Sequence, residues 1–157
     1  MNLFMNEDKA LLVVQMEEIS RKSHMIQTIK HPQIIHMYSY DMHLLSSKYN
    51  IETLMYYVER FKIDYVCVNI PITKYIDLSK ELISRLHMEC CNAHIIASGE
   101  AITQEISIDI GADAYSYDGN DLIRVIDGLE EKEEMMYGIY NQYYERAPLT
   151  NTEDMLS

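Results

Sequence analysis

Two small groups of residues in this chain carry side chains that are suited to chemistry. Cys90 and Cys91 are adjacent and are flanked by His87 and His94, and thiolates and imidazoles of this kind bind zinc when they converge on one point. Adjacent cysteines seldom chelate one ion without a second pair elsewhere, and the remaining cysteine, Cys67, lies alone in an apolar run. We therefore expect no metal site, and we expect Cys67 to be a core residue.

Glu17 and Glu18 are the second group, because two neighbouring carboxyl groups can act as acid and base. No nucleophile is placed near them by the sequence. The chain also has no glycine-rich phosphate loop, no His-Glu-x-x-His pattern and no Ser-His-Asp order. We assign no catalytic residue and expect no enzyme activity from this chain alone.

Short apolar runs alternate with stretches of helical periodicity along most of the chain. The clearest helix has Ile51, Leu54, Met55, Val58 and Phe61 on one face. Strands are predicted over residues 10–16, 33–40, 64–70, 93–97 and 112–117, and helices over residues 17–30, 47–62, 73–88, 100–110 and 120–129. This alternation predicts an α/β fold of the flavodoxin-like or Rossmann-like class, with a five-stranded parallel sheet and helices on both faces.

Ligands bind such sheets at the carboxyl ends of the strands, so the residues that follow each strand are the candidates. The expected binding residues at this edge are Asn69, Thr73, Ser98, Gly99 and Tyr117. His43 follows the second predicted strand, in a loop where it either faces the same cleft as a ligand or is solvated, and a solvated loop histidine is the more common case. Ser98 and Thr103 can donate to a phosphate or can cap the next helix, and capping is the more common role.

The C-terminal region has a different composition from residues 1–129, which we expect to form the α/β domain. Residues 130–134 are acidic, and Met136, Tyr140 and Tyr143 then follow at helical spacing. A C-terminal helix over residues 130–146 is predicted, which either packs on its own sheet or forms a dimer with a second copy. Residues 147–157 show no pattern and are expected to be a frayed tail.

The overall composition restricts the partners and the compartment. The chain has 157 residues and a net charge of −12, so it should repel nucleic acid. No run of eighteen apolar residues is present, which argues against a membrane span. The first residues carry acids rather than the lysines of a signal peptide, so a cytoplasmic location is expected.

The segment from Ile95 to Tyr115 resembles the cobalamin-binding domains of corrinoid proteins. It reads Ile95-Ile96-Ala97-Ser98-Gly99, then Thr103-Gln104-Glu105, then Ile110-Gly111-Ala112-Asp113-Ala114-Tyr115. That family reads there as an apolar strand, Gly-Gly, a turn with Thr-Gln-Glu, and Ile-Gly-Ala-Asp-Gly-Tyr. The strand Ile63 to Asn69 is similar to the Pro-Asp-apolar strand of the family.

The ligand-binding positions that the resemblance implies fit less well. The family carries Asp-x-His-x-x-Gly after the first strand, and its histidine coordinates cobalt, but residues 15–22 hold neither histidine nor glycine. Asn69 stands in place of the family's serine, and Ser98 in place of the first glycine. The remaining candidates for an axial ligand, to cobalt or to the haem that some related domains sense, are His24, His43 and His94.

These departures predict a cobalamin-binding-like domain whose cofactor site is eroded and which holds no cofactor. The function expected is regulatory or scaffolding, through a protein partner or a homodimer. One alternative is a corrinoid carrier or cobalamin sensor that binds the cofactor base-on, as the small subunit of a methyltransferase or mutase system does. A haem-sensing variant of the same fold is the second alternative.

Overall fold

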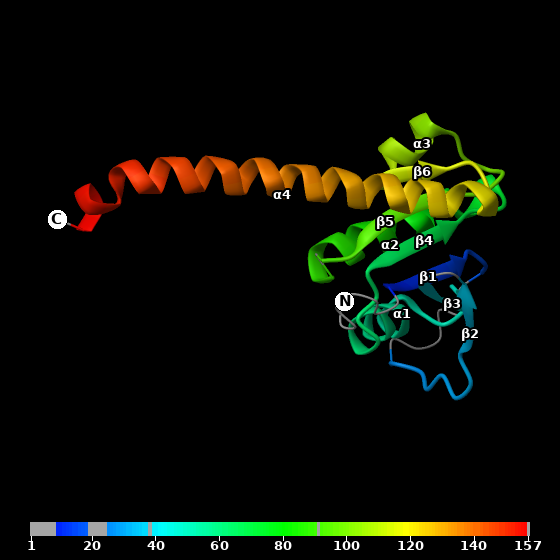
Figure 1. Ribbon diagram of the computed structural model, residues 1–157. Helices are drawn as coiled ribbons and strands as arrows, with labels where there is room; N and C mark the ends of the chain where they lie inside the picture. Colours follow the sequence, from blue (N-terminus) through cyan, green and yellow to red (C-terminus); the bar gives the residue numbers. More distant parts are fainter. Residues whose placement is uncertain (1–8, 19–24, 38, 91, 157) are drawn as a thin grey trace. The chain divides into compact units, whose positions relative to one another are not determined.

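The computed structural model describes the backbone of residues 9–18, 25–37, 39–90 and 92–156, and side chains as far as residue 139. The chain divides into two compact units, residues 1–119 and residues 120–157. The first unit holds a sheet and its helices, and the second consists of one helix. Figure 1 shows the elements in chain order.

The first unit is built on a six-stranded sheet with the order β2-β3-β1-β4-β5-β6. All neighbouring strands are parallel except β2 and β3, which are antiparallel. The strands are β1 (Lys9–Gln15), β2 (Gln33–Met37), β3 (Tyr40–Ser46), β4 (Tyr65–Asn69), β5 (His94–Ser98) and β6 (Ala114–Ser116). The predicted α/β class is confirmed, with six strands in place of five.

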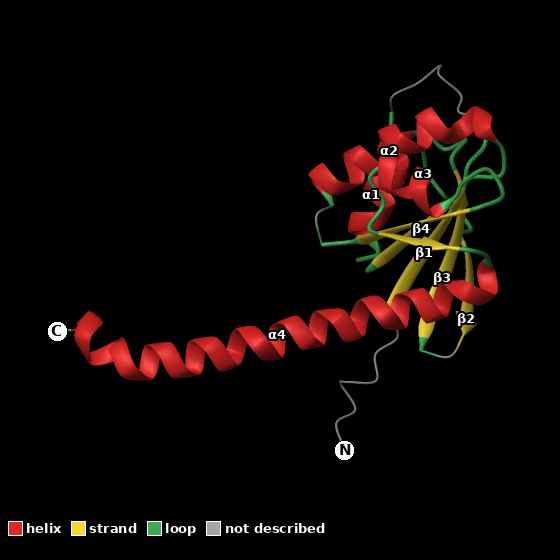
Figure 2. Ribbon diagram, turned by 90° about the horizontal axis from the view of Figure 1, so that it is seen from above, coloured by secondary structure: helices red, strands yellow, loops and turns green. Residues whose placement is uncertain are grey.

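Three α-helices of the first unit pack on the same face of this sheet (Figure 2). They are α1 (Ile51–Arg60), α2 (Ile76–Glu89) and α3 (Gln104–Asp109), and a short 3-10 helix, η2 (Thr73–Tyr75), precedes α2. The face consists of alternate strand residues, among them Leu12, Val68 and Ile95, because successive side chains of a strand point to opposite faces. Burial of this face against the three helices forms the core.

The predicted strand over residues 33–40 was wrong in its extent, because the chain turns back after Met37. Residues 33–37 form β2, and Tyr40 to Ser46 form β3, which pairs in parallel with β1. β3 alternates polar and apolar residues, in the sequence Tyr-Asp-Met-His-Leu-Leu-Ser. That alternation is typical of a strand near a sheet edge. The prediction relied on continuous apolar runs and therefore missed β3.

The predicted helix over residues 17–30 was also wrong for residues 25–30, which are irregular. Residues 19–24 lie outside the described residues. The segment is held by the start of α1: the amide of Gln27 donates to Oγ1 of Thr53 at 2.8 Å, and Nδ2 of Asn50 donates to the carbonyl of Met25 at 2.7 Å. These contacts join residues more than twenty positions apart, so local periodicity could not reveal them.

The second unit is the helix α4 (Gly119–Leu156), which begins three residues after β6. It passes without interruption through the expected boundary between residues 129 and 130. The division into a domain, a separate C-terminal helix and a tail stays a prediction.

Candidate functional site

The carboxyl ends of five neighbouring strands finish on polar residues that form one row across the sheet. Gln15 of β1 is paired with Ser46 of β3 and with Asn69 of β4, and the row continues through Ser98 of β5 to Ser116 of β6. Residues that are level in neighbouring parallel strands project to the same face. The row therefore lies on the face opposite to α1, α2 and α3, at the edge where such sheets bind ligands.

The crevice between β1 and β4, where the strand order reverses, is bridged by the chain itself. Nδ2 of Asn69 donates to Oε1 of Gln15, and the amide of Met16 donates to the carbonyl of Asn69 at 3.0 Å. In the loops beyond the strands, Nζ of Lys74 donates to Oε1 of Glu18 at 2.9 Å, and this hydrogen bond raises the pKa of Lys74. The side chains of Gln15 and Asn69 and of Glu18 and Lys74 are thus paired with each other beside the point where the strand order reverses.

Glu17 is held on the other side of β1 by the end of β3. Oγ of Ser46 donates to Oε2 of Glu17. Ser47 receives the amide of Glu17 at 2.6 Å and donates its hydroxyl to the carbonyl of Glu17 at 2.7 Å. Glu17 thus fastens the loop after β1 to the loop after β3, which is a structural role.

Gly99 stands directly after β5 and is the second of the two positions, Ser98 and Gly99, at which the family has glycines that let a cofactor approach the backbone. Its φ is +119°, and a Cβ there would overlap the carbonyl oxygen of Ile70 and lie 2.6 Å from the carbonyl carbon and amide nitrogen of Ile70. The amide of Ile70 donates to the carbonyl of Ser98 at 2.8 Å, and the amide of Ala101 donates to the carbonyl of Ile70 at 3.2 Å. Because Gly99 has no Cβ, the backbone of the turn after β4 can pack directly against it.

Other residues that carry the resemblance also have contacts within the fold. Thr103 is the N-cap of α3, and its Oγ1 accepts from the amide of Ile106 at 3.2 Å. Oδ2 of Asp113 accepts from the amide of Ile95 at 2.7 Å. Gly111 has a φ of +89° directly after α3, the left-handed conformation that ends many helices. Each of these residues has a folding role that needs no ligand.

The expected binding residues divide into two sets. Asn69, Ser98 and Gly99 come together at the carboxyl edge, where Asn69 and Ser98 are paired in register. Thr73 begins η2 and is exposed, and Tyr117 follows β6 with 74% of its surface exposed. The row also contains Gln15, Ser46 and Ser116, which sequence reasoning missed. Each is the last residue of its strand, so a search restricted to strand ends would have found them once β3 was recognised.

The expected position of His43 was wrong, because it lies inside β3 rather than in a loop at the cleft. It is 5% exposed, and its Nδ1 lies 2.6 Å from the hydroxyl of Tyr57 on α1. The rings of Tyr57 and Phe61 pack beside it, with centroids 5.4 and 5.5 Å away. Burial lowers the pKa of His43 below 6.5, Asp41 partly opposes this shift, and His36 adds to it. Burial also raises the pKa of Tyr57 to about 12.

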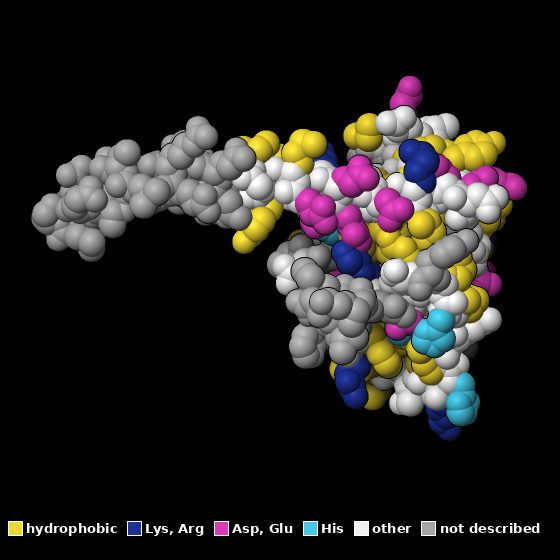
Figure 3. Space-filling model, in the orientation of Figure 1, with side chains coloured by type: hydrophobic (Ala, Val, Ile, Leu, Met, Phe, Trp, Pro, Cys, Tyr) yellow, Lys and Arg dark blue, Asp and Glu magenta, His cyan; other side chains and the backbone are white. Residues whose placement is uncertain are grey.

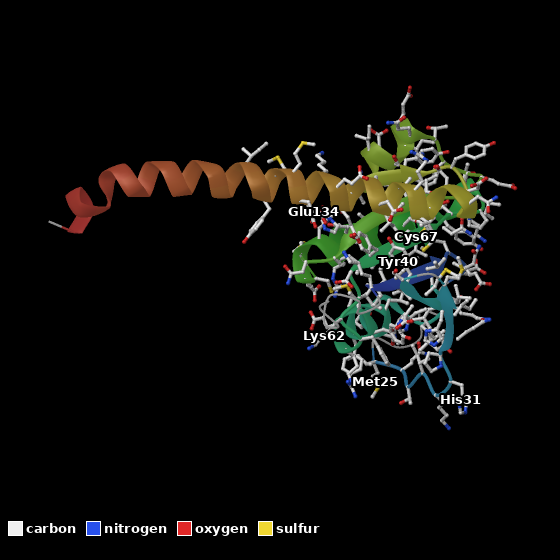
Figure 4. All side chains as sticks on the ribbon, in the orientation of Figure 1. Met25, His31, Tyr40, Lys62, Cys67 and Glu134 are labelled. Atoms are coloured by element: carbon white, nitrogen blue, oxygen red, sulfur yellow. The ribbon has the colours of Figure 1, made fainter. Side chains whose placement is uncertain are left out.

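Of the other two candidate axial ligands, the structure describes only His94, which is not at the carboxyl edge either. His94 is the first residue of β5, at the amino edge of the sheet, and its ring stacks on that of Tyr65. His24 lies outside the described residues. Cys67 is buried in β4, as expected, and burial raises its pKa to about 12, so it is an unreactive thiol (Figure 4).

Two features of the described residues bear on the site of a corrinoid. Where the family's bare backbone would face the cofactor, Gly99 faces Ile70, and the strand-end polar groups of β1 and β4 are bonded to each other. Over the described residues there is also no group of three or more His, Cys, Asp or Glu side chains that could hold a metal ion. A helix long and apolar enough to cross a membrane is likewise absent from that part of the chain.

The strand order and the parallel crossovers define an α/β protein of the flavodoxin-like class. Among solved structures, the chain is similar to a novel cobalamin-binding protein from Desulfitobacterium hafniense DCB-2, solved at 1.5 Å, with a TM-score of 0.59 and 12% sequence identity. The match covers 78% of this chain and 59% of that one, so this chain spans less than two thirds of its length. The likeness shows a cobalamin-binding-like fold.

Sequence comparison adds nothing to this structural likeness. No model of a protein family matches the chain, and no curated protein matches it.

Proposed function

We propose that this chain is a non-catalytic domain of cobalamin-binding-like fold that holds no cofactor and acts through protein contacts, in a regulatory or scaffolding role. The observation that carries the proposal is the backbone of Ile70 against Gly99. In this fold a bare glycine after the strand gives a nucleotide tail access to the backbone. Here the backbone of the turn after β4 lies against this glycine. The residues that carry the resemblance have contacts within the fold that account for their presence.

The row of strand-end residues supports the same proposal. Gln15, Asn69 and Glu17 use their polar groups on neighbouring parts of the chain. A ligand at this edge would have to break these hydrogen bonds and replace each of them, since an unpaired polar group that stays buried costs about 1–3 kcal/mol. Closure of the edge by its own side chains disfavours any ligand of the size of a nucleotide tail.

The test is a binding measurement on the full chain by absorbance. Hydroxocobalamin and hemin are added separately, excess ligand is removed, and the spectrum of the protein fraction is recorded. We expect no retained absorbance with either ligand. Retained cobalamin or haem absorbance in stoichiometric amount would overturn the proposal.

A matched variant, Ser98→Gly, restores the first glycine of the family's Gly-Gly pair. If the turn at Ile70 closes the site, this variant also retains no cobalamin. Binding by Ser98→Gly alone would mean that one Cβ closes the site, and the explanation from Ile70 would be wrong.

A second candidate function is a corrinoid carrier or cobalamin sensor that binds base-on, because the solved neighbour is a cobalamin-binding protein. In that mode the cofactor keeps its own base on cobalt, so no protein histidine is needed. The same titration with hydroxocobalamin decides between the two functions.

A further inference from the structure

The chain contains two Asp-Gly pairs, which the structure places in different backbone settings. Asp118-Gly119 joins β6 to α4, and Asp127-Gly128 lies inside α4. All four residues are exposed, and a Cβ added at either glycine would have no atom of another part of the chain within 4 Å. Figure 3 shows acidic side chains on the surface of the first part of α4. The two pairs therefore match in residue type and in access to water.

An aspartate that precedes a glycine can close a cyclic imide with its own backbone. The amide nitrogen of the glycine loses its proton and attacks Cγ of the aspartate, the Cγ–O bond breaks, and a water molecule leaves. Water then opens the imide. Cleavage between the nitrogen and Cγ restores aspartate, whereas cleavage between the nitrogen and the main-chain carbonyl carbon gives isoaspartate, whose backbone runs through Cγ. Glycine favours the attack because it has no Cβ and its backbone adopts many conformations.

The backbone amide that must attack is held in one pair and not in the other. Gly119 is the first residue of α4, and the first four amides of an α-helix have no carbonyl partner within the helix. Gly128 lies in the interior of α4, where its amide donates to the carbonyl of Arg124, four residues earlier. Attack by the amide of Gly128 therefore requires α4 to open locally, which costs free energy. Attack by the amide of Gly119 requires no helical hydrogen bond to break.

A buried hydroxyl group donates to the peptide bond of the first pair. Oγ of Ser116, the last residue of β6, donates to the carbonyl oxygen of Asp118 at 2.8 Å, and Ser116 is 0% exposed. When the amide of Gly119 loses its proton, the negative charge is shared with this carbonyl oxygen, because the peptide bond is conjugated. A hydrogen bond to that oxygen stabilises the charge, as a donor of an oxyanion hole does. Ser116 thus favours the attacking form of the amide.

We propose that Asp118-Gly119 is a site of spontaneous backbone isomerisation, promoted by the hydroxyl of Ser116, and that Asp127-Gly128 is protected by α4. Only water leaves and returns, so no further reactant is needed. Gly119 is the last residue of the first compact unit, so the reaction inserts one backbone carbon where the chain passes into α4. The connection between the two units therefore changes with the age of the protein. This inference does not depend on the proposed function.

The test is a count of isoaspartate after prolonged incubation of the full chain in mildly acidic buffer, below its melting temperature. Trypsin cleaves after Arg85, Arg124 and Lys132, so the two pairs fall in separate peptides, residues 86–124 and 125–132. Electron-transfer fragmentation locates isoaspartate in each peptide. We expect at least about tenfold more isoaspartate at position 118 than at position 127, because opening of the helix limits the second site. Equal amounts at the two positions, or none at position 118, would overturn the proposal.

The same incubation in urea separates structure from local sequence. Without α4, the two pairs should isomerise at similar rates, because each is an aspartate followed by glycine. A preference for position 118 that is as large in urea as in buffer would trace the difference to the neighbouring residues, and the explanation from the fold would be wrong.

Variants of Ser116 test the role of the hydroxyl. Ser116→Ala removes the donor and should slow isomerisation at position 118 at least about threefold, whereas Ser116→Thr keeps a hydroxyl and should stay close to wild type. Asp118→Glu is the negative control for the assay, because its longer side chain disfavours the ring. Circular dichroism confirms that each variant is folded. An unchanged rate in Ser116→Ala, or equal slowing in Ser116→Thr, would overturn the assignment of Ser116.

Discussion

The carboxyl edge of the sheet and residues 135–139 of α4 use their side chains in opposite ways. At the edge, Gln15 and Asn69 form a hydrogen bond with each other, and Glu17 joins the loop after β1 to the end of β3. The backbone of Ile70 packs against Gly99. Beyond residue 134, Met135, Met136 and Ile139 are left in water. The polar side chains at the usual ligand edge of this fold are bonded within the chain, whereas large apolar side chains of α4 are exposed. The following predictions test this contrast.

Gly99→Ala should have the largest effect. The new Cβ would overlap the carbonyl oxygen of Ile70, and the φ of +119° is one that alanine rarely adopts. The free energy of unfolding, measured by urea denaturation with circular dichroism, should fall by about 3 kcal/mol or more.

Gly111→Ala is the matched control for that substitution. Gly111 also has a positive φ, but its Cβ would lie 3.6 Å from the nearest atom, Cγ2 of Ile83, which is ordinary contact. We expect a loss of only about 1–2 kcal/mol from backbone strain. Equal losses at the two glycines would mean that the turn after β4 can move away, and that the edge is not closed.

The buried site of His43 should make stability depend on pH. The pKa of His43 is lowered by burial, so between that value and 6.5 the unfolded chain binds more protons than the folded chain. Stability therefore falls as the pH drops below about 6.5. His43→Gln keeps a polar group near Tyr57 without titrating, and its unfolding free energy should decrease less between pH 7 and pH 5. Identical pH profiles would place His43 in a solvated position, as the sequence had suggested.

Asn69→Ala removes one side of the amide bridge between β1 and β4. The loss of this partly buried hydrogen bond should lower the free energy of unfolding by about 1 kcal/mol. Thr73→Ala, at an exposed position beyond the same strand, should stay within about 0.5 kcal/mol of wild type. An Asn69→Ala variant as stable as wild type would show that the bridge does not hold the edge closed.

Gly138→Ala should give the smallest change, and in the opposite direction. Gly138 lies in α4 with no atom of another part within 4 Å of an added Cβ. Alanine should stabilise the helix by about 0.5–1 kcal/mol, seen as a higher melting temperature by circular dichroism. Destabilisation would indicate close packing at Gly138.

The sequence predicted those parts of the fold that depend on local periodicity. The apolar runs of β1, β4 and β5 and the amphipathic faces of α1 and α2 occur close to the predicted ranges. β3 was missed because its polar alternation spans Asp41 and His43, and residues 25–30 were misassigned because Asn50 and Thr53 hold them.

At the candidate site, the sequence identified the strand ends at Asn69 and Ser98 but not what they contact. The pairing of Asn69 with Gln15 joins residues 54 positions apart, and the approach of Ile70 to Gly99 depends on the turn after β4. Contacts of this kind follow from the register of the sheet, which no local pattern encodes.

The position of β1 in the sheet has a consequence for the synthesis of the chain. β1 lies between β3 and β4, so both of its partners are translated after it, and Gln15 meets Asn69 only when 54 further residues have been made. At about 5–20 residues per second, this takes roughly 3–10 s. For that time an apolar strand, Ala-Leu-Leu-Val-Val at its centre, has at least one open edge, the one that β4 later covers. The nascent chain is therefore most exposed to aggregation and to chaperones before β4 leaves the ribosome.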